Sequence, residues 1–245
     1  MGMFRTTHLA IWVILAGMLV ASANRVDASP ILTLTSGAST VSVTDNGAGD
    51  LDPTVGAITF LGSVGSFNVN TATGYSYPVI GSTDTASLDL NSIDARNTAT
   101  GTASLTVSLT DSGFTQGLGL PGYLEWAWAG TITQGDTVSG LAYINDGSTI
   151  TTGPLGPFAG AFGPLSSTFG SSGTALHPAL VSPYSMTIST TISANGLASY
   201  SGNFSLDNTL VPEPASLFLL GTGLIGVGAF ARRRFRRAKT QNAST

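Results

Sequence analysis

Apolar and polar residues alternate along most of the chain between residues 29 and 210, and helical periodicity is hard to find there. In the segment 105–110, Leu105, Val107 and Leu109 fall on one face, and serine or threonine fills the other. The same alternation recurs in the segments 41–44, 88–90 and 186–189. This period of two is typical of strands with one buried face, so we expect about ten to twelve short strands.

Turn-forming dipeptides separate the strand-like runs at Asn46-Gly47, Asp146-Gly147 and Asn195-Gly196. Each pair can adopt the positive φ angles of a tight hairpin turn. The clearest predicted hairpin joins 186–194 to 197–206 around Asn195-Gly196. No domain boundary is evident, so residues 29–210 are expected to form one antiparallel β-sandwich of jelly-roll-like type.

One segment, 153–183, interrupts the alternation. It contains five prolines and six glycines. Because proline cannot donate a hydrogen bond to a neighbouring strand, we expect a long surface loop here.

The first 28 residues have the three parts of a secretory signal peptide. Arg5 supplies positive charge, the segment 9–20 is an apolar core, and Ala21-Ser22-Ala23 is a small-residue cleavage site. Val26-Asp27-Ala28 is a second candidate site. We predict export through the Sec machinery, with cleavage after Ala23 or Ala28.

The C-terminal part has the pattern of a transmembrane helix. Residues 215–231 are uncharged, and 17 residues of helix reach about 25 Å, which suits a thin bilayer. A basic cluster follows, formed by Arg232, Arg233, Arg234, Arg236 and Arg237. By the positive-inside rule this cluster and the tail 238–245 lie in the cytoplasm, so everything before Val211 lies across the membrane.

The order of motifs in this tail is specific. Val211, Pro212, Glu213 and Pro214 precede the short apolar span, and the arginines follow it. Residues 211–237 thus resemble the PEP-CTERM sorting signal of Gram-negative bacteria, a tail also called the ice-binding protein C-terminal domain. The resemblance implies recognition by an exosortase, cleavage near the Pro-Glu-Pro motif, and delivery to the cell surface or an exopolysaccharide matrix.

The charge of the exported part differs from that of the whole chain. Residues 29–210 contain one basic residue, Arg96, and eleven acidic residues, so their net charge is −10 (1 − 11). Such a domain does not attract nucleic acid or anionic lipid. The chain has no cysteine, which excludes thiol chemistry, iron–sulfur clusters and cysteine zinc sites.

Two residues of the segment 123–128 suggest a sugar-binding surface. Trp126 and Trp128 are two positions apart, so in a strand they point to the same face. If this face is exposed, the two rings can stack on sugars. The alternative is that both rings point into the core with Leu124, which shares their side.

A glycine-rich turn holds the candidate calcium ligands Asp45, Asp50 and Asp52. Calcium takes six to eight oxygen ligands from loops of this kind, but the spacing departs from an EF-hand. The simpler alternative is a turn with solvated aspartates. We expect no other cofactor.

Catalytic residues are scarce. His177 is the one histidine of the exported part, and its place in the segment 153–183 predicts a surface histidine without a nucleophilic serine. A glycan-active enzyme would have to use Glu125 with an aspartate partner.

Ice binding by threonine pairs is a further alternative, although their intervals are irregular. The groups are Thr33/Thr35, Thr71/Thr73, Thr83/Thr85, Thr98/Thr100/Thr102 and Thr131/Thr133.

The sequence therefore predicts a non-enzymatic, exported protein of the cell surface or exopolysaccharide matrix, which reaches its place through the tail. The alternative is a polysaccharide-binding module, assisted by calcium or not, that uses Trp126 and Trp128.

Overall fold

The computed structural model describes residues 29–147, 150–159, 167–181, 183–211, 221–222 and 224–225. Between residues 29 and 211 the described chain forms twelve β-strands and no helix, arranged in two six-stranded sheets. From edge to edge, sheet A contains β2 (Ser39–Thr44), β1 (Ile31–Ser36), β6 (Thr102–Phe114), β11 (Tyr184–Asn195), β8 (Thr137–Asn145) and β9 (Ile150–Ala159). Sheet B contains β10 (Ser167–His177), β7 (Gly122–Ile132), β12 (Ala198–Leu210), β5 (Ala86–Asn97), β4 (Phe67–Tyr75) and β3 (Ala57–Val64).

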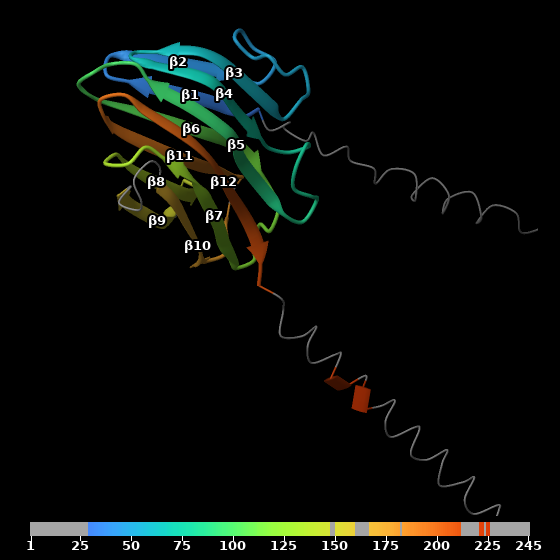
Figure 1. Ribbon diagram of the computed structural model, residues 1–245. Helices are drawn as coiled ribbons and strands as arrows, with labels where there is room; N and C mark the ends of the chain where they lie inside the picture. The colour runs from blue at the N-terminus through green and yellow to red at the C-terminus, as the bar shows by residue number, and fades with distance from the viewer. Residues whose placement is uncertain are drawn as a thin grey trace, which may run out of the picture.

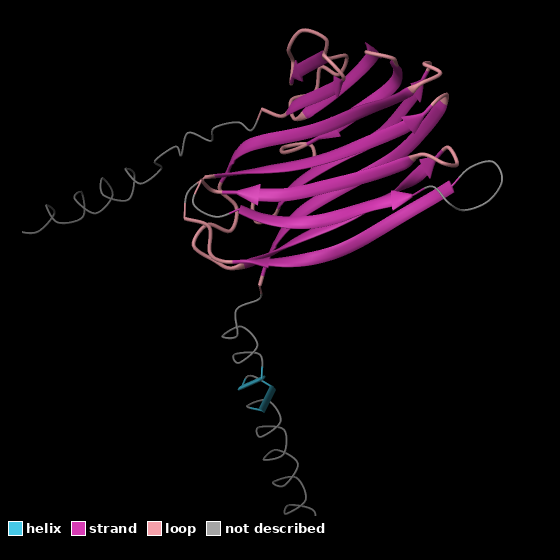
Figure 2. Ribbon diagram, turned by 90° about the vertical axis from the view of Figure 1, so that its left-hand side faces the viewer, coloured by secondary structure: helices cyan, strands magenta, loops and turns pink. Residues whose placement is uncertain are grey.

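The two sheets pack face to face, and neighbouring strands within each sheet are antiparallel (Figure 1). The predicted all-β antiparallel sandwich is confirmed. The strands run side by side along the molecule, so the loops gather at its two ends (Figure 2). We name the end at which β12 finishes the exit end; its loops include 45–56, 76–85, 115–121, 146–147 and 178–181.

The last eight strands have the order of a jelly roll. Strands β5 to β12 form the four-stranded units β5-β12-β7-β10 in sheet B and β6-β11-β8-β9 in sheet A. The four N-terminal strands extend these units, since β1 and β2 add to β6, and β4 and β3 add to β5. The N-terminal third of the domain therefore widens a jelly roll that the rest of the chain defines.

The alternation in β6 gives the expected two faces. Leu105, Val107 and Leu109 are fully buried between the sheets. The hydroxyl residues between them face outward and hydrogen-bond their neighbours on β11, with oxygen–oxygen distances of 2.7–2.9 Å. These pairs are Thr106–Thr191, Ser108–Ser189 and Thr110–Thr187.

An aromatic cluster lies in the core near β7 and β12. The ring centroid of Trp128 lies 4.8 Å from that of Phe169 and 5.6 Å from that of Phe204. Phe169 in turn stacks on Tyr200 at 5.8 Å. Gly140 leaves room for the Trp128 ring, because a Cβ there would lie 3.1 Å from it. Contacts of this kind add stability beyond the burial of apolar area.

The predicted hairpin around Asn195-Gly196 is wrong. Both strands exist, but β11 pairs with β6 and β8 in sheet A, whereas β12 pairs with β5 and β7 in sheet B. The turn therefore carries the chain from one sheet to the other, with Gly196 at a φ of +101°. A turn dipeptide identifies the turn but not the partner of each strand, which depends on distant segments.

The predicted loop 153–183 is also wrong over most of its length. Its residues 153–159 belong to β9 and 167–177 form β10, which are edge strands of the two sheets. An edge strand tolerates proline, because one side of its backbone has no partner strand. Glycine has a packing role too: a Cβ at Gly173 would lie 2.5 Å from the indole ring of Trp126.

His177 is buried at the exit end, with 1 % of its surface exposed, and is not the predicted surface residue. Its Nδ1 lies 2.8 Å from the carbonyl oxygen of Pro178, and its Nε2 lies 2.8 Å from Oδ1 of Asn208. Asn208 donates to the Tyr184 hydroxyl at 2.8 Å, and Tyr184 donates to the carbonyl oxygen of Gln116 at 2.9 Å. Burial raises the pKa of Tyr184 to about 12, so the phenol remains a donor at neutral pH. This chain of hydrogen bonds ties β10, β11 and β12 to the loop 115–121.

A buried carboxyl group lies at the same end on β6. Asp111 is 1 % exposed and accepts hydrogen bonds from the Ser76 hydroxyl and from the N–H of Ser112. Burial raises the pKa of Asp111 to about 6, although these hydrogen bonds oppose the rise. The folded protein therefore keeps this side chain protonated up to a higher pH than an exposed aspartate.

Asp111 should make the protein less stable as the pH rises from 4 to 6. The folded-state pKa of about 6 lies above the ordinary value of 3.8, so the folded state binds the extra proton between these values. A shift of about two pKa units corresponds to roughly 3 kcal/mol. We expect the unfolding free energy of the wild type, minus that of Asp111→Asn, to fall by about this amount from pH 4 to pH 7. Urea denaturation at each pH measures both values. Parallel curves for the two proteins would contradict the assignment, and Asp84→Asn, in an exposed loop, is the control.

Candidate functional site

The two tryptophans proposed for sugar stacking point inward. Trp128 is 2 % exposed and lies in the aromatic cluster, and Leu124 on the same face is fully buried. Trp126 is partly buried against the core. Burial removes Trp128 from the predicted pair of stacking rings, because the alternation that aligns the two rings also aligns them with Leu124 on the inner face. Trp126 is partly exposed and lines a hollow beside Glu125.

The aspartates proposed for calcium hold their own loop together. Asp50 accepts hydrogen bonds from the backbone N–H groups of Asn46, Asp52 and Thr59, each at 2.9 Å. Asp45 accepts from the N–H of Gly56 at 2.8 Å, and Asp52 from that of Thr54 at 2.9 Å. In the described part of the chain, no three histidine, aspartate or glutamate side chains gather as metal ligands. These hydrogen bonds favour the interpretation that the aspartates stabilise a turn over the interpretation that they bind calcium.

Asp50→Ala should destabilise the protein by roughly 1–3 kcal/mol in urea denaturation, because three N–H groups lose one acceptor. Asp84→Ala is the matched control, an exposed loop aspartate whose loss should cost less than about 0.5 kcal/mol. The turn interpretation also predicts that about 5 mM calcium leaves the midpoint of wild-type unfolding unchanged, although this concentration exceeds the ~0.1–1 mM dissociation constants of the weakest extracellular sites. A calcium-dependent rise that Asp50→Ala abolishes would establish a metal site instead.

The outer face of sheet B carries a shallow hollow with a floor of small residues. Ala127 and Ala129 of β7 form the floor with Gly170 of β10, which lies opposite Ala129. Larger polar side chains stand around this floor. A second hollow shares Ala127, Ser172 and Ser205 with the first. We name the two adjoining hollows together the trough; their combined rim contains Asp89, Glu125, Asn203, Ser205 and Asp207.

Three carboxylates of the rim come from neighbouring strands. Glu125 of β7 lies opposite Asp207 of β12 in the strand register. Asp89 of β5 lies opposite Ser205, two residues before Asp207. Side chains that face each other across antiparallel strands have Cβ atoms about 5 Å apart, so negative charges are close together here.

The trough is anionic and accepts hydrogen bonds. Burial and the negative charge of Asp207 raise the pKa of Asp89. Asp207 accepts a hydrogen bond from Ser87 at 2.5 Å, and Glu125 accepts one from Thr209 at 3.1 Å. Arg96, the one basic residue of 29–210, pairs in register with Asn68 and Ser199 near the opposite end of β5, so no cation neutralises the trough.

Glu125, the carboxylate considered for glycan chemistry, has an acidic neighbour, since it lies opposite Asp207 on the same face of sheet B. A glycosidase needs two carboxyl groups that flank the scissile bond. The ring nitrogens of His177 contact Pro178 and Asn208, neither of which is a nucleophile.

The threonine pairs do not form one array. Thr33 and Thr35 lie on β1 beside the hydroxyl pairs of sheet A, whereas Thr71 and Thr73 lie on β4 of sheet B. The remaining groups lie partly in strands and partly in turns; they are Thr83/Thr85, Thr98/Thr100/Thr102 and Thr131/Thr133. Because these groups lie on different sheets and turns, they do not present a single flat threonine surface.

Asp89, Asp207 and Asn203 were missed as candidates at the sequence level. Polar residues at every second position from 199 to 209 mark the outer face of one strand. That signal was present, but the partners on β5 and β7 follow only from the register.

Strand β12 runs directly into the tail. Leu210 still pairs with Gly122, and the N–H of Val211 donates to the carbonyl oxygen of Pro121 at 3.2 Å. Pro212, Glu213, Pro214 and the arginines lie outside the described residues, as does the predicted signal peptide 1–28. Of the apolar run, only 221–222 and 224–225 are described; within the described residues, no helix reaches the length and apolar character that a membrane crossing needs.

Residues 210–237 match the profile of the PEP-CTERM protein-sorting motif. The chain therefore carries a PEP-CTERM sorting tail, as its motifs predicted. This tail implies export, targeting to the membrane or surface, and processing by an exosortase.

No curated protein matches the chain. Among solved structures, the chain is similar to TmCBM61 in complex with β-1,4-galactotriose, at 11 % identity and a TM-score of 0.29, over 58 % of this chain and 81 % of that one. A second similar structure is that of the infectious bursal disease virus Gx strain, at 10 % identity and a TM-score of 0.32, over 74 % and 51 % of the two chains. Scores this low carry no functional argument.

Proposed function

We propose that this chain is an exported, non-enzymatic protein that an exosortase processes and delivers to the cell surface or an exopolysaccharide matrix. The match of residues 210–237 to the sorting motif carries the proposal. In this scheme residues 1–28 direct export through the Sec machinery, and residues 215–231 hold the precursor in the membrane with its arginines in the cytoplasm. The β-sandwich is the part that remains after processing.

The position of β12 supports processing at the motif. The last described hydrogen bond of the domain involves Val211, and Pro212 follows immediately. A cut at the motif therefore leaves every strand of the sandwich intact. The released domain keeps its complete core and its charge of −10.

Replacing Pro212, Glu213 and Pro214 together by alanine should leave unprocessed precursor in the membrane fraction of the native host. Intact mass should show a wild-type product that begins near residue 24 or 29 and ends near residue 212. Pro183→Ala is the matched control, since it changes an exposed proline outside the motif. Normal processing and release of the triple variant would refute the role of the motif.

Polysaccharide binding is a second candidate function of the same domain, and the trough is the observation that favours it. Its floor is open and its rim offers carboxylate, amide and hydroxyl groups that can hydrogen-bond to sugar hydroxyls. Because the rim is anionic, a neutral polysaccharide suits it better than an acidic one. This mode needs no exposed tryptophan.

A bulky residue on the trough floor should block such binding. Ala127→Phe should lower the retention of the protein on neutral glucans and galactans at least about tenfold, because the new ring fills the space between the rim residues. Ser193→Phe is the control, an exposed strand position on sheet A. Equal retention of both variants, or stronger retention on polygalacturonate than on neutral polymers, would remove this candidate.

A further inference from the structure

Exposed apolar side chains gather at the exit end of the sandwich. Of the eleven large hydrophobic side chains more than about a third exposed between residues 29 and 211 in the described part of the chain, eight belong to this end, and Leu197 is the only one at the opposite end. Those closest in the fold to the exit of β12 are Leu120, Tyr123, Leu176 and Val181.

These residues come from segments that contact one another. Leu176 of β10 lies opposite Tyr123 of β7 on the outer face of sheet B. Leu120 and Val181 belong to two loops joined by the bridge between Leu118 and Leu180. Val181 and Leu176 are the most exposed of the group, at 75 % and 64 %. We name Leu120, Tyr123, Leu176 and Val181 the apolar rim.

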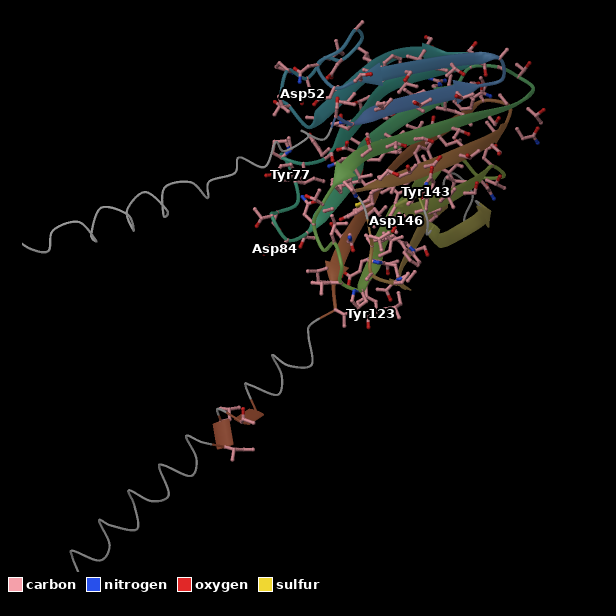
Figure 3. The ribbon with its side chains drawn as sticks, turned by 180° about the vertical axis from the view of Figure 1, so that it is seen from behind. Asp52, Tyr77, Asp84, Tyr123, Tyr143 and Asp146 are labelled. Carbon is pink, nitrogen blue, oxygen red and sulfur yellow. The ribbon has the colours of Figure 1, made fainter. Side chains whose placement is uncertain are left out.

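Hydrogen bonds hold the apolar rim in place. The N–H of Gly119 donates to the carbonyl oxygen of Leu180 at 2.8 Å, and the N–H of Val181 donates to Asp146 at 3.1 Å. The His177 chain of hydrogen bonds fixes the ends of β10 and β12 beside these loops. Tyr123 marks the side of the molecule where β12 ends, and Tyr77 and Asp84 lie farther along the same edge (Figure 3).

The length of the chain brings this end to the membrane. Three residues separate Val211 from Ala215, the first residue of the apolar run, and the four Cα-to-Cα steps between them span at most about 14 Å when extended. If the run lies in the bilayer, the exit end must therefore lie at the bilayer surface. Exposed apolar patches mark interaction surfaces, and this one surrounds the point at which the chain leaves the domain toward the apolar run.

We propose that, while the tail holds the precursor in the membrane, the apolar rim inserts into the interfacial layer of the bilayer. This inference rests on the proposed function, because it needs the tail in the membrane. Tyrosine and aliphatic side chains suit this layer. The domain has no basic residue at this end, so apolar contact rather than attraction to anionic headgroups drives insertion. Insertion would hold residues 212–214 at the membrane surface for processing.

A single-cysteine experiment tests the contact, since the chain has no cysteine of its own. Val181→Cys carries an environment-sensitive fluorophore in the full chain, reconstituted into phosphatidylethanolamine and phosphatidylglycerol vesicles. Leu197→Cys is the matched control, an apolar residue 60 % exposed at the opposite end. Lipids with a spin label near the headgroup should quench the label at position 181 at least about threefold more than the label at 197. This difference should not increase when the phosphatidylglycerol fraction is raised, because the loops of the exit end carry aspartates and no lysine or arginine.

A third label separates failure of this inference from failure of the proposed function. Leu224→Cys places the fluorophore in the apolar run. Because residue 224 lies midway along the run, its quencher is a lipid with the spin label on the acyl chain. Without quenching at 224 by this lipid, the membrane stage of the proposed function fails. With quenching at 224 but equal access of aqueous iodide to 181 and 197, the rim does not touch the bilayer and the inference is overturned. A label at 181 shielded from both iodide and lipid quenchers would mean that protein covers the rim, which also overturns it.

Discussion

The insertion of β12 between β5 and β7 is the interaction on which the rest of the structure depends. This strand contributes Tyr200, Phe204 and Leu206 to the core, and without it sheet B would divide into two separate pieces. Because β12 is the last strand, the sheet can close only when the chain is available through Leu210. The tail is thus attached to the element that completes the fold, with no spacer between folding unit and sorting motif.

The outer faces of the two sheets are both polar but differ in kind. On sheet A, serine and threonine hydroxyls of β6 and β11 hydrogen-bond each other, which satisfies part of their capacity within the protein. On sheet B, carboxylates of β5, β7 and β12 gather around a floor of alanine and glycine. Among the described residues, the hollows on this face are lined by carboxylates, whereas the hollow over β6, β8 and β11 of sheet A is not.

Local pattern was a reliable guide to the strands and a poor guide to their partners. Alternation located β6 and β11, because burial of one face selects every second residue whatever the neighbouring strand is. The Asn195-Gly196 turn was identified, but its two strands lie in different sheets. Prolines and glycines concealed β9 and β10, since an edge strand accepts residues that a central strand rejects. His177 was predicted to lie on the surface for the same reason, because its segment was interpreted as a loop and not as an edge strand.

The sequence by itself determined the two-faced strands, the acidic exported part and the sorting tail, because each depends on residues that are close together along the chain. The tertiary structure alone decided that Trp126 and Trp128 face inward, that the aspartates of the loop 45–56 bind its own backbone, and that Asp89, Glu125 and Asp207 share one face. These features join segments up to about 120 residues apart, such as Ser87 and Asp207. Strand register brings such segments together, and a pattern within one segment contains no information about it.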